Sequence, residues 1–158
     1  MVEIIPFSKE LRSHFYSINE EWISAMFTME PIDEDVLKNP EQKILEPGGH
    51  IWFAHHSEYG VVGTCALRKT GDREYELTKM GVLKKARGLK AGEKLLQFVI
   101  DFVESNELGD CYLLTNSDCK AAIHLYEKNG FVHDDEIKSR YGCEYERCDV
   151  AMRLETKG

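Results

Sequence analysis

Strand-like and helix-like stretches alternate in a fixed order between Glu76 and Phe131. The segment begins with the run Glu76–Val82 and continues through a basic, glycine-containing loop, residues 83–92, into a stretch of helical periodicity. A second apolar run, residues 112–116, and a second helical stretch, residues 122–131, follow. Two strands joined by a helical crossover lie parallel in one sheet, so this order predicts a mixed α/β fold.

The rest of the chain predicts further strands and helices around this segment. A turn at residues 57–60 joins two strand-like runs into a hairpin, and Ser8 is a candidate N-cap for a long amphipathic helix. We find no repeat and no linker, so we expect one domain over residues 1–158, with a central mixed sheet flanked by helices. The expected elements are strand 2–7, helix 8–29, a short helix 33–37, strands 50–56, 60–68 and 75–82, a helix from about residue 88, strand 111–115, helix 119–128, and strands 131–137 and 145–154.

Composition excludes several functional classes. The 158 residues carry a formal net charge of −8, which argues against a basic face for duplex nucleic acid. No apolar run approaches the roughly 20 residues of a membrane span, and the N-terminal residues do not resemble a targeting signal. We therefore expect a cytoplasmic protein that binds neither nucleic acid nor membrane.

The five cysteines are an odd number and include no CxxC pair, so reduced thiols are expected rather than a disulfide framework. Cys143, Cys148 and His133 could be imagined as metal ligands, but their spacing matches no zinc pattern. We expect no metal.

The loop Arg87–Gly92 has the features of a phosphate-binding site. Its two glycines, Gly88 and Gly92, allow close backbone approach, and the following helix offers unpaired N–H groups at the positive end of its dipole. Lys84, Lys85, Arg87 and Lys90 add positive charge. A solvated basic turn that caps a helix is the alternative interpretation of the same residues.

The order and spacing of these pieces resemble the acyl-CoA-binding core of the GNAT N-acetyltransferases. The pattern Ala122-x-x-Leu125-Tyr126-x-x-x-Gly130-Phe131 is similar to the second signature block of that family. The pyrophosphate loop of the family has the form Q/R-x-x-G-x-G/A. Arg87 and Gly92 match its outer positions, but Lys90 stands in place of the central glycine. With a negative φ, Lys90 would still present its backbone N–H to a phosphate.

The resemblance implies a binding site for acetyl-CoA. It assigns the pyrophosphate to the loop of Arg87, Gly88, Leu89, Lys90, Ala91 and Gly92. The backbone of Met80 and Val82 would pair with the pantetheine arm as an added strand would. Asn116, at the end of the next strand, would contact the same arm or the pyrophosphate.

The resemblance also implies two catalytic residues. Tyr126 would point its hydroxyl at the thioester sulfur and protonate the departing thiolate. Glu76 would remove a proton from the incoming ammonium, directly or through water, although a solvent-facing strand carboxylate is an equal alternative. The backbone N–H of Met80 is the expected stabiliser of the tetrahedral oxyanion.

The expected activity is acetyl transfer from acetyl-CoA to a primary amine by direct attack in a ternary complex. A GNAT fold that binds acyl-CoA as a sensor without turnover is the alternative, and Lys90 motivates it. A nucleotide-dependent enzyme is less well supported, because neither GxxxxGK[ST] nor GxGxxG is present. Cys119 as a covalent relay lacks a paired histidine signature.

The acceptor is the least constrained part of the prediction. We expect residues 19–49 and 141–145 to bind a small-molecule or peptide amine, with Tyr145 and Arg147 lining the cleft. A homodimer would be common for such a small fold. The acidic surplus of the first segment would attract a polyamine, a lysine side chain or an aminoglycoside, or is simply a solvated helix face. Its members are Glu20, Glu21, Glu30, Asp33, Glu34 and Asp35.

Overall fold

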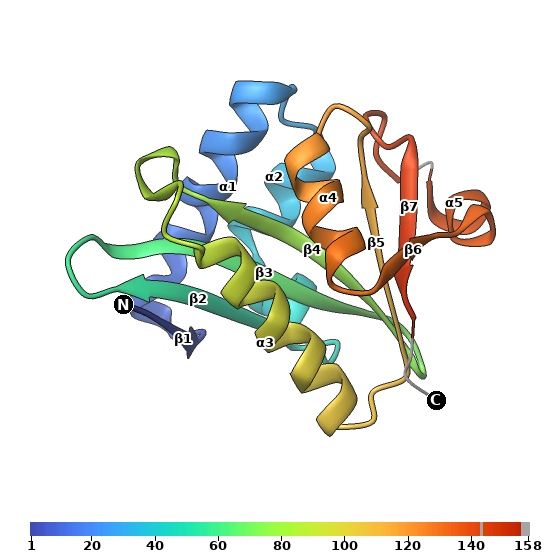
Figure 1. Ribbon diagram of the computed structural model, residues 1–158, viewed down its shortest axis with the longest axis horizontal. Coiled ribbons are helices and arrows are strands. Elements are labelled where there is room, and N and C mark those ends of the chain that lie inside the picture. Colours follow the sequence, from blue (N-terminus) through green and yellow to red (C-terminus); the bar gives the residue numbers. More distant parts are fainter. Residues whose placement is uncertain (143, 156–158) are drawn as a thin grey trace.

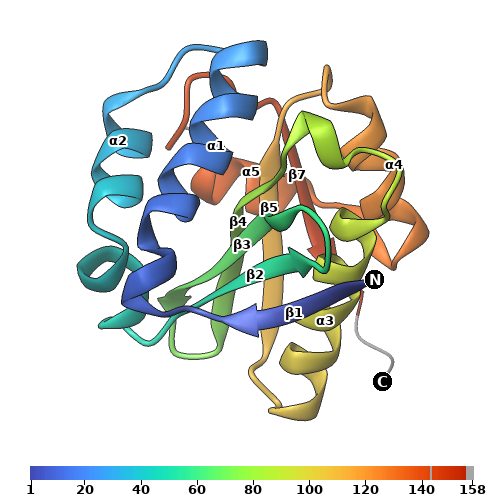
Figure 2. The same cartoon turned by 90° about the vertical axis from the view of Figure 1, so that its left-hand side faces the viewer.

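The computed structural model describes residues 1–142 and 144–155. A seven-stranded sheet with the order β1-β2-β3-β4-β5-β7-β6 forms the centre, and helices cover both of its faces (Figures 1 and 2). The pair β4–β5 is parallel, whereas the other neighbouring strands are antiparallel. The predicted mixed α/β fold, with hairpins first and a parallel crossover after them, is confirmed. The strands are β1 (Val2–Pro6), β2 (His50–His56), β3 (Gly60–Gly71), β4 (Glu74–Val82), β5 (Asp110–Thr115), β6 (Phe131–His133) and β7 (Val150–Leu154).

The helices divide between the two faces. Leu95, Leu96 and Val99 of α3 pack with Leu77 of β4 in one core, which α4 extends toward β6. On the opposite face, Phe15 and Ile23 of α1 pack against Phe53 of β2. The helices are α1 (Arg12–Met26), α2 (Pro31–Lys38), α3 (Ala91–Ser105), α4 (Lys120–Lys128) and α5 (Asp135–Tyr141), with the short turns η1 (Lys9–Leu11), η2 (Glu41–Leu45) and η3 (Lys84–Ala86).

A bulge in β4 opens the middle of the sheet. The register pairs Thr64 with Gly81 and Ala66 with Thr78, so Lys79 and Met80 together lie opposite Cys65 alone. Lys79 has a left-handed backbone, with φ of 51°. A bulge of this kind bends its strand. Pairing of β4 with β5 ends at Leu77 and Leu113, and beyond this point the two strands part.

Three predicted elements are wrong in extent. The strand expected at residues 131–137 ends at His133, because the carboxylate of Asp134 accepts a hydrogen bond from the N–H of Ile137 and caps α5. The strand expected at 145–154 begins only at Val150. The helix expected at 8–29 is the turn η1 followed by α1, which ends at Met26, and Ser8 makes no side-chain capping bond.

The cysteines within the described residues, Cys65, Cys111, Cys119 and Cys148, are free thiols. Cys143, one of the imagined metal ligands, lies outside the described residues. Within the described ranges, no helix is long and apolar enough to span a membrane.

Candidate active site

The parting of β4 from β5 creates a central cavity of about 60 Å³. Residues 77–80 of β4 form one wall, and residues 113–116, at the end of β5, form the other. Tyr145 and Arg147 close it from the loop before β7, and Trp22 and Phe27 close it from α1 and the residue after it. The prediction that Tyr145 and Arg147 line an acceptor cleft stays a prediction. The cavity therefore exists because the bulge separates two strands that would otherwise be paired.

A larger groove, of about 400 Å³, lies beside the cavity toward α3 and α4. Several residues predicted to bind acetyl-CoA line it together: Met80, Val82, Arg87, Gly92 and Tyr126. The groove and the central cavity share part of their lining, namely Trp22, Met80, Thr115, Cys119 and Tyr126. A ligand in the groove would therefore reach the cavity at these shared residues.

The loop before α3 presents free backbone donors. Among the hydrogen bonds of the described residues, none engages the N–H groups of Gly88, Lys90, Ala91, Gly92 or Glu93. Leu89 differs, because its N–H donates to the carbonyl of Ala86 at 3.2 Å. Unpaired donors at a helix N-terminus favour an anion such as a pyrophosphate.

Lys90 has a left-handed backbone. Its φ is +61°, so the condition of a negative φ, considered from the sequence, is not met. A side chain in this region costs of the order of 1 kcal/mol, which glycine would avoid. The structure thus gives a physical reason for a glycine at this position, and the lysine occupies it at a cost in conformational energy.

We expect Lys90→Gly to unfold at an equal or higher temperature, with a gain of up to about 1 kcal/mol, because the relief of left-handed strain offsets the added chain entropy. The matched control is Lys94→Gly, inside the same helix, which should lose about 1 kcal/mol. Thermal unfolding followed by circular dichroism measures both. A loss in Lys90→Gly as large as in the control would contradict the strain argument.

Tyr126 lies at the junction of the groove and the cavity. Its side chain is 9% exposed, and within the described part of the chain its hydroxyl has no hydrogen-bond partner. Burial raises the pKa of this phenol, with a further contribution from Cys119. The hydroxyl is therefore protonated at neutral pH and available to a ligand.

Asn116 lies in the wall of the cavity, but both ends of its amide are engaged by the protein. Nδ2 donates to the carbonyl of Arg147 at 2.6 Å, and Oδ1 accepts from the N–H of Asp118 at 2.8 Å. Asn116 thus ties the end of β5 to the loop that carries Arg147. Its contact with the pantetheine arm stays a prediction.

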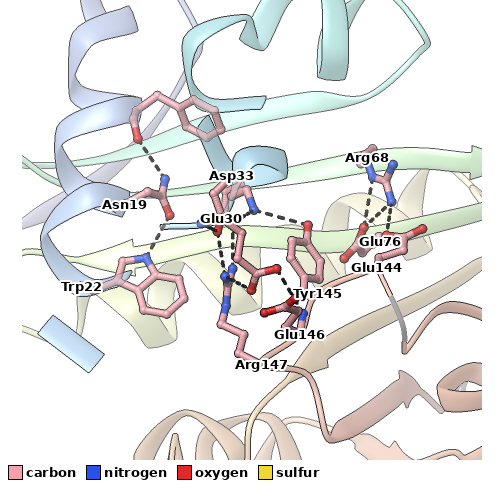
Figure 3. Close-up of polar contacts among 12 residues, drawn as sticks. Asn19, Trp22, Glu30, Asp33, Arg68, Glu76, Glu144, Tyr145, Glu146 and Arg147 are labelled. Atoms are coloured by element: carbon pink, nitrogen blue, oxygen red, sulfur yellow. Dashed lines mark hydrogen bonds and ion pairs between the residues drawn. The ribbon is translucent and has the colours of Figure 1, made fainter. Parts of the chain in front are cut away.

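Glu76 is buried on the sheet face opposite α3 and accepts two hydrogen bonds from Arg68, at 3.0 and 2.8 Å. Arg68 also donates to Glu144 (Figure 3). Burial raises the pKa of Glu76 more than the charge of Arg68 lowers it. Glu76 is outside the lining of the central cavity, so its role as a base stays a prediction that requires a connecting water.

A buried ion-pair network stands on one side of the cavity (Figure 3). Asp33, which is fully buried on α2, accepts from Lys79 Nζ at 2.8 Å and from both terminal nitrogens of Arg147 at 2.7 Å. Glu30 also accepts from Arg147, and Tyr145 lies against both cations. Burial alone would raise the pKa of Asp33, but the bonds from Arg147 and Lys79 lower it to about 2.

The bulge determines which face Lys79 occupies. In a regular strand, side chains alternate, so Lys79 would share the face of Leu77 and point toward α3. The extra residue shifts the alternation, and Lys79 reaches Asp33 on the other side. The sequence interpretation missed Lys79, and it named Asp33 only as part of an acidic surplus. A lysine at a core position of an apolar strand is the signal that could have indicated a bulge.

Trp22, which lies within the helix predicted at residues 8–29, lines both the cavity and the groove. Its indole N–H donates to the buried amide of Asn19 at 2.9 Å, and Asn19 donates to the carbonyl of Phe15. The indole ring lies directly over Gly81, where a methyl group would collide with it. The absence of a side chain at Gly81 thus leaves the space that the indole occupies.

Comparison with known sequences gives consistent matches. The family model described as an acetyltransferase (GNAT) domain matches residues 47–133. A protein of Escherichia coli, named as the uncharacterized N-acetyltransferase YjgM, is 31% identical over 116 residues, which cover 72% of this chain and 68% of that protein. The probable N-acetyltransferase camello of Xenopus tropicalis is 31% identical over 100 residues, 62% of this chain. The matched region spans only 45% of the length of camello.

Solved structures share the fold over almost the whole chain. A GNAT-family acetyltransferase of Staphylococcus aureus superposes with a TM-score of 0.85 at 24% identity, covering 98% of both chains. The PaiA N-acetyltransferase of Thermoplasma acidophilum, solved in complex with coenzyme A, gives a TM-score of 0.71 at 16% identity over 99% of both chains. At these identities the likeness establishes the fold.

Proposed function

Because the chain belongs to the GNAT acetyltransferase family, we propose that it transfers an acetyl group from acetyl-CoA to a primary amine by direct attack in a ternary complex. One observation carries the proposal: the groove and the cavity meet at Tyr126, whose side chain is largely buried and whose hydroxyl has no hydrogen-bond partner among the described residues. The donor would lie in the groove and the acceptor in the cavity, with the phenol between them.

The groove offers what acetyl-CoA requires. The free N–H groups at residues 88 and 90–93 would hold the pyrophosphate, with Arg87 beside it. The pantetheine arm would extend along Met80 and Val82, beyond the last pair of β4 with β5. The Thermoplasma neighbour was solved with coenzyme A, which makes the same ligand a reasonable candidate here.

The chemistry requires three proton transfers. The amine nitrogen attacks the thioester carbonyl once its ammonium proton has passed to a base, and the N–H of Met80 would bind the oxyanion. The C–S bond then breaks, and Tyr126 donates its proton to the thiolate, which leaves as the thiol of CoA. The nitrogen still carries the extra proton of the attacking amine and gives it, directly or through water, to the phenolate, so the products are the neutral acetylated amine and CoA.

Glu76, acting through water, is the proposed base. We expect Glu76→Gln to lower kcat by about 100-fold and to remove the acidic limb of the pH profile, because an amide accepts no proton. The raised pKa of Glu76 places that limb above the range of an ordinary carboxyl. The matched control is Glu144→Gln, which alters the other carboxylate on Arg68 and should keep the limb. A slower Glu76→Gln enzyme with an unchanged profile would reduce Glu76 to a structural partner of Arg68.

The proposed activity is tested by release of free CoA from acetyl-CoA across a panel of amines, amino acids and peptide N-termini. Turnover with any of them supports acetyl transfer. Calorimetric binding of acetyl-CoA without turnover across the panel would favour the alternative, a GNAT-fold sensor. A shift in melting temperature with ATP or NAD, and none with CoA, would overturn both.

A further inference from the structure

The charged side chains that line the central cavity, within the described residues, are both cations: Lys79 and Arg147. Lys79 is almost fully buried, and the side chain of Arg147 is 15% exposed. On the charged side of this cavity, a ligand would therefore contact hydrogen-bond donors. The acidic composition of the chain does not indicate a cationic cavity lining, because composition does not say which way each carboxylate points.

The neighbouring carboxylates are committed to protein cations. Asp33 accepts four hydrogen bonds, from Lys79, from two nitrogens of Arg147 and from the N–H of Glu30. Glu30 accepts from Arg147 and from the N–H of Glu146. Glu34 and Asp35, farther along α2, pair with lysines. The acidic residues of α2 thus stabilise the protein internally, and none of these lines the cavity as a free site for an ammonium group.

Arg147 retains an unused edge. Its two terminal nitrogens bind the carboxylate of Asp33 end-on, and the second N–H of Nη1 is taken by Glu30. No acceptor among the described residues engages Nε or the second N–H of Nη2. These two donors lie side by side on the guanidinium, with the spacing of the two oxygens of a carboxylate.

The guanidinium is held rigidly in this orientation. Its Cζ lies 4.8 Å from the ring centroid of Tyr145 and 5.9 Å from that of Phe27, and Asp33 fixes its end. Because Arg147 is already ordered, a ligand that binds its free edge loses little further side-chain entropy. Lys79 adds one more N–H, since among the described residues Asp33 and Tyr145 accept from two of its three.

We propose that the free edge of Arg147 binds a carboxylate of the acceptor, so that the acceptor is an amino acid or another small amine with a neighbouring carboxylate. This inference rests on the proposed function in one respect: it takes the central cavity as the acceptor site. The carboxylate on Arg147 would orient the amine toward the donor groove across Tyr126. A polyamine has no group for this edge, and its charge would oppose both lining cations.

The test uses binding as well as turnover. Calorimetry on the CoA-loaded protein compares N-acetyl-amino acids with their amides, in matched pairs of alanine, methionine, phenylalanine, glutamate and lysine. At least one acid should bind about tenfold or more tightly than its amide, because a bidentate charged pair is lost in the amide. Equal binding within every pair, or no detectable binding of any acid, would overturn the inference.

Two variants assign the effect to Arg147. Arg147→Lys keeps the charge beside Asp33 but loses the planar fork, so the preference for acid over amide should fall to within about threefold. The matched control, Arg153→Lys, alters an arginine paired with Asp134 outside the cavity and should keep the preference. An unchanged preference in Arg147→Lys would contradict the assignment. If that variant fails to fold, the acid and amide comparison on the wild-type protein still decides the matter.

The turnover assay separates this inference from the proposed function. CoA release with polyamines or simple amines, and none with amino acids, would overturn the carboxylate site and leave acetyl transfer standing. A clear binding preference for the acids without release of CoA would uphold the carboxylate site and overturn transfer.

Discussion

Replacing Tyr126 by phenylalanine should lower kcat by about 100-fold while the affinity for acetyl-CoA stays within about twofold of the wild type. The change removes one hydroxyl that has no partner among the described residues, so no protein contact is lost and folding should be unaffected. Because the pKa of this phenol is raised, the wild-type hydroxyl is protonated over the working range of pH, and its loss should appear at every pH. Steady-state release of CoA and calorimetric titration with acetyl-CoA measure the two quantities.

The matched control for this variant is Tyr75→Phe. Tyr75 belongs to the same apolar core as Tyr126, is 6% exposed and lies outside both the groove and the cavity. Loss of its hydroxyl should leave kcat within a factor of two. Undiminished turnover in Tyr126→Phe would refute the role of Tyr126 as the acid, and equal losses in both variants would point to a general effect on the core.

Local pattern predicted the segments of this fold that bury apolar side chains. The hairpin of β2 and β3, the parallel crossover from β4 through α3 to β5, and the helix carrying Tyr126 all follow from periodicity and turn residues. The region after β6 was misjudged because Val132 and Ile137 suggest a strand, whereas the Asp134 carboxylate caps a helix. A capping bond depends on one side chain and is easily outweighed in a pattern of apolar residues.

That the groove brings together the loop before α3 and the helix of Tyr126 could be predicted from sequence, because both belong to one segment of characteristic order and spacing. The loop at residues 87–92 and the helix of Tyr126 flank one groove. The central cavity could be predicted only in part, since it joins distant segments of the chain. Tyr145 and Arg147 were expected to line a cleft, but Lys79 was not. The bulge that turns Lys79 toward Asp33 depends on the left-handed backbone of Lys79, and its signal in the sequence is weak: a lysine at a core position of an apolar strand.

Removing the charge of Asp33 should produce the largest loss of stability of any single change in the ion-pair network. In Asp33→Asn, Lys79 and Arg147 keep their positive charges in a buried environment. Both have lost the carboxylate of Asp33, which compensates these charges in the wild-type protein. Breaking a buried pair in this way typically costs about 3–5 kcal/mol. We expect a loss of that size in urea unfolding at neutral pH. The matched control is Asp35→Asn on the same helix, whose exposed pair with Lys43 should contribute less than about 1 kcal/mol.

The same carboxylate predicts a pH dependence with a definite sign. Its pKa is lowered from 3.8 to about 2 in the folded protein, so below pH 4 the unfolded chain takes up this proton more readily than the folded one. The contribution of Asp33 to stability is therefore complete above about pH 5 and declines as the pH falls toward 2. In Asp33→Asn this decline should be absent, so the difference in stability between the two proteins should shrink below pH 4. A difference that stays constant from pH 6 to pH 3 would show that the loss in the variant comes from the helix cap with Glu30 rather than from the buried charges.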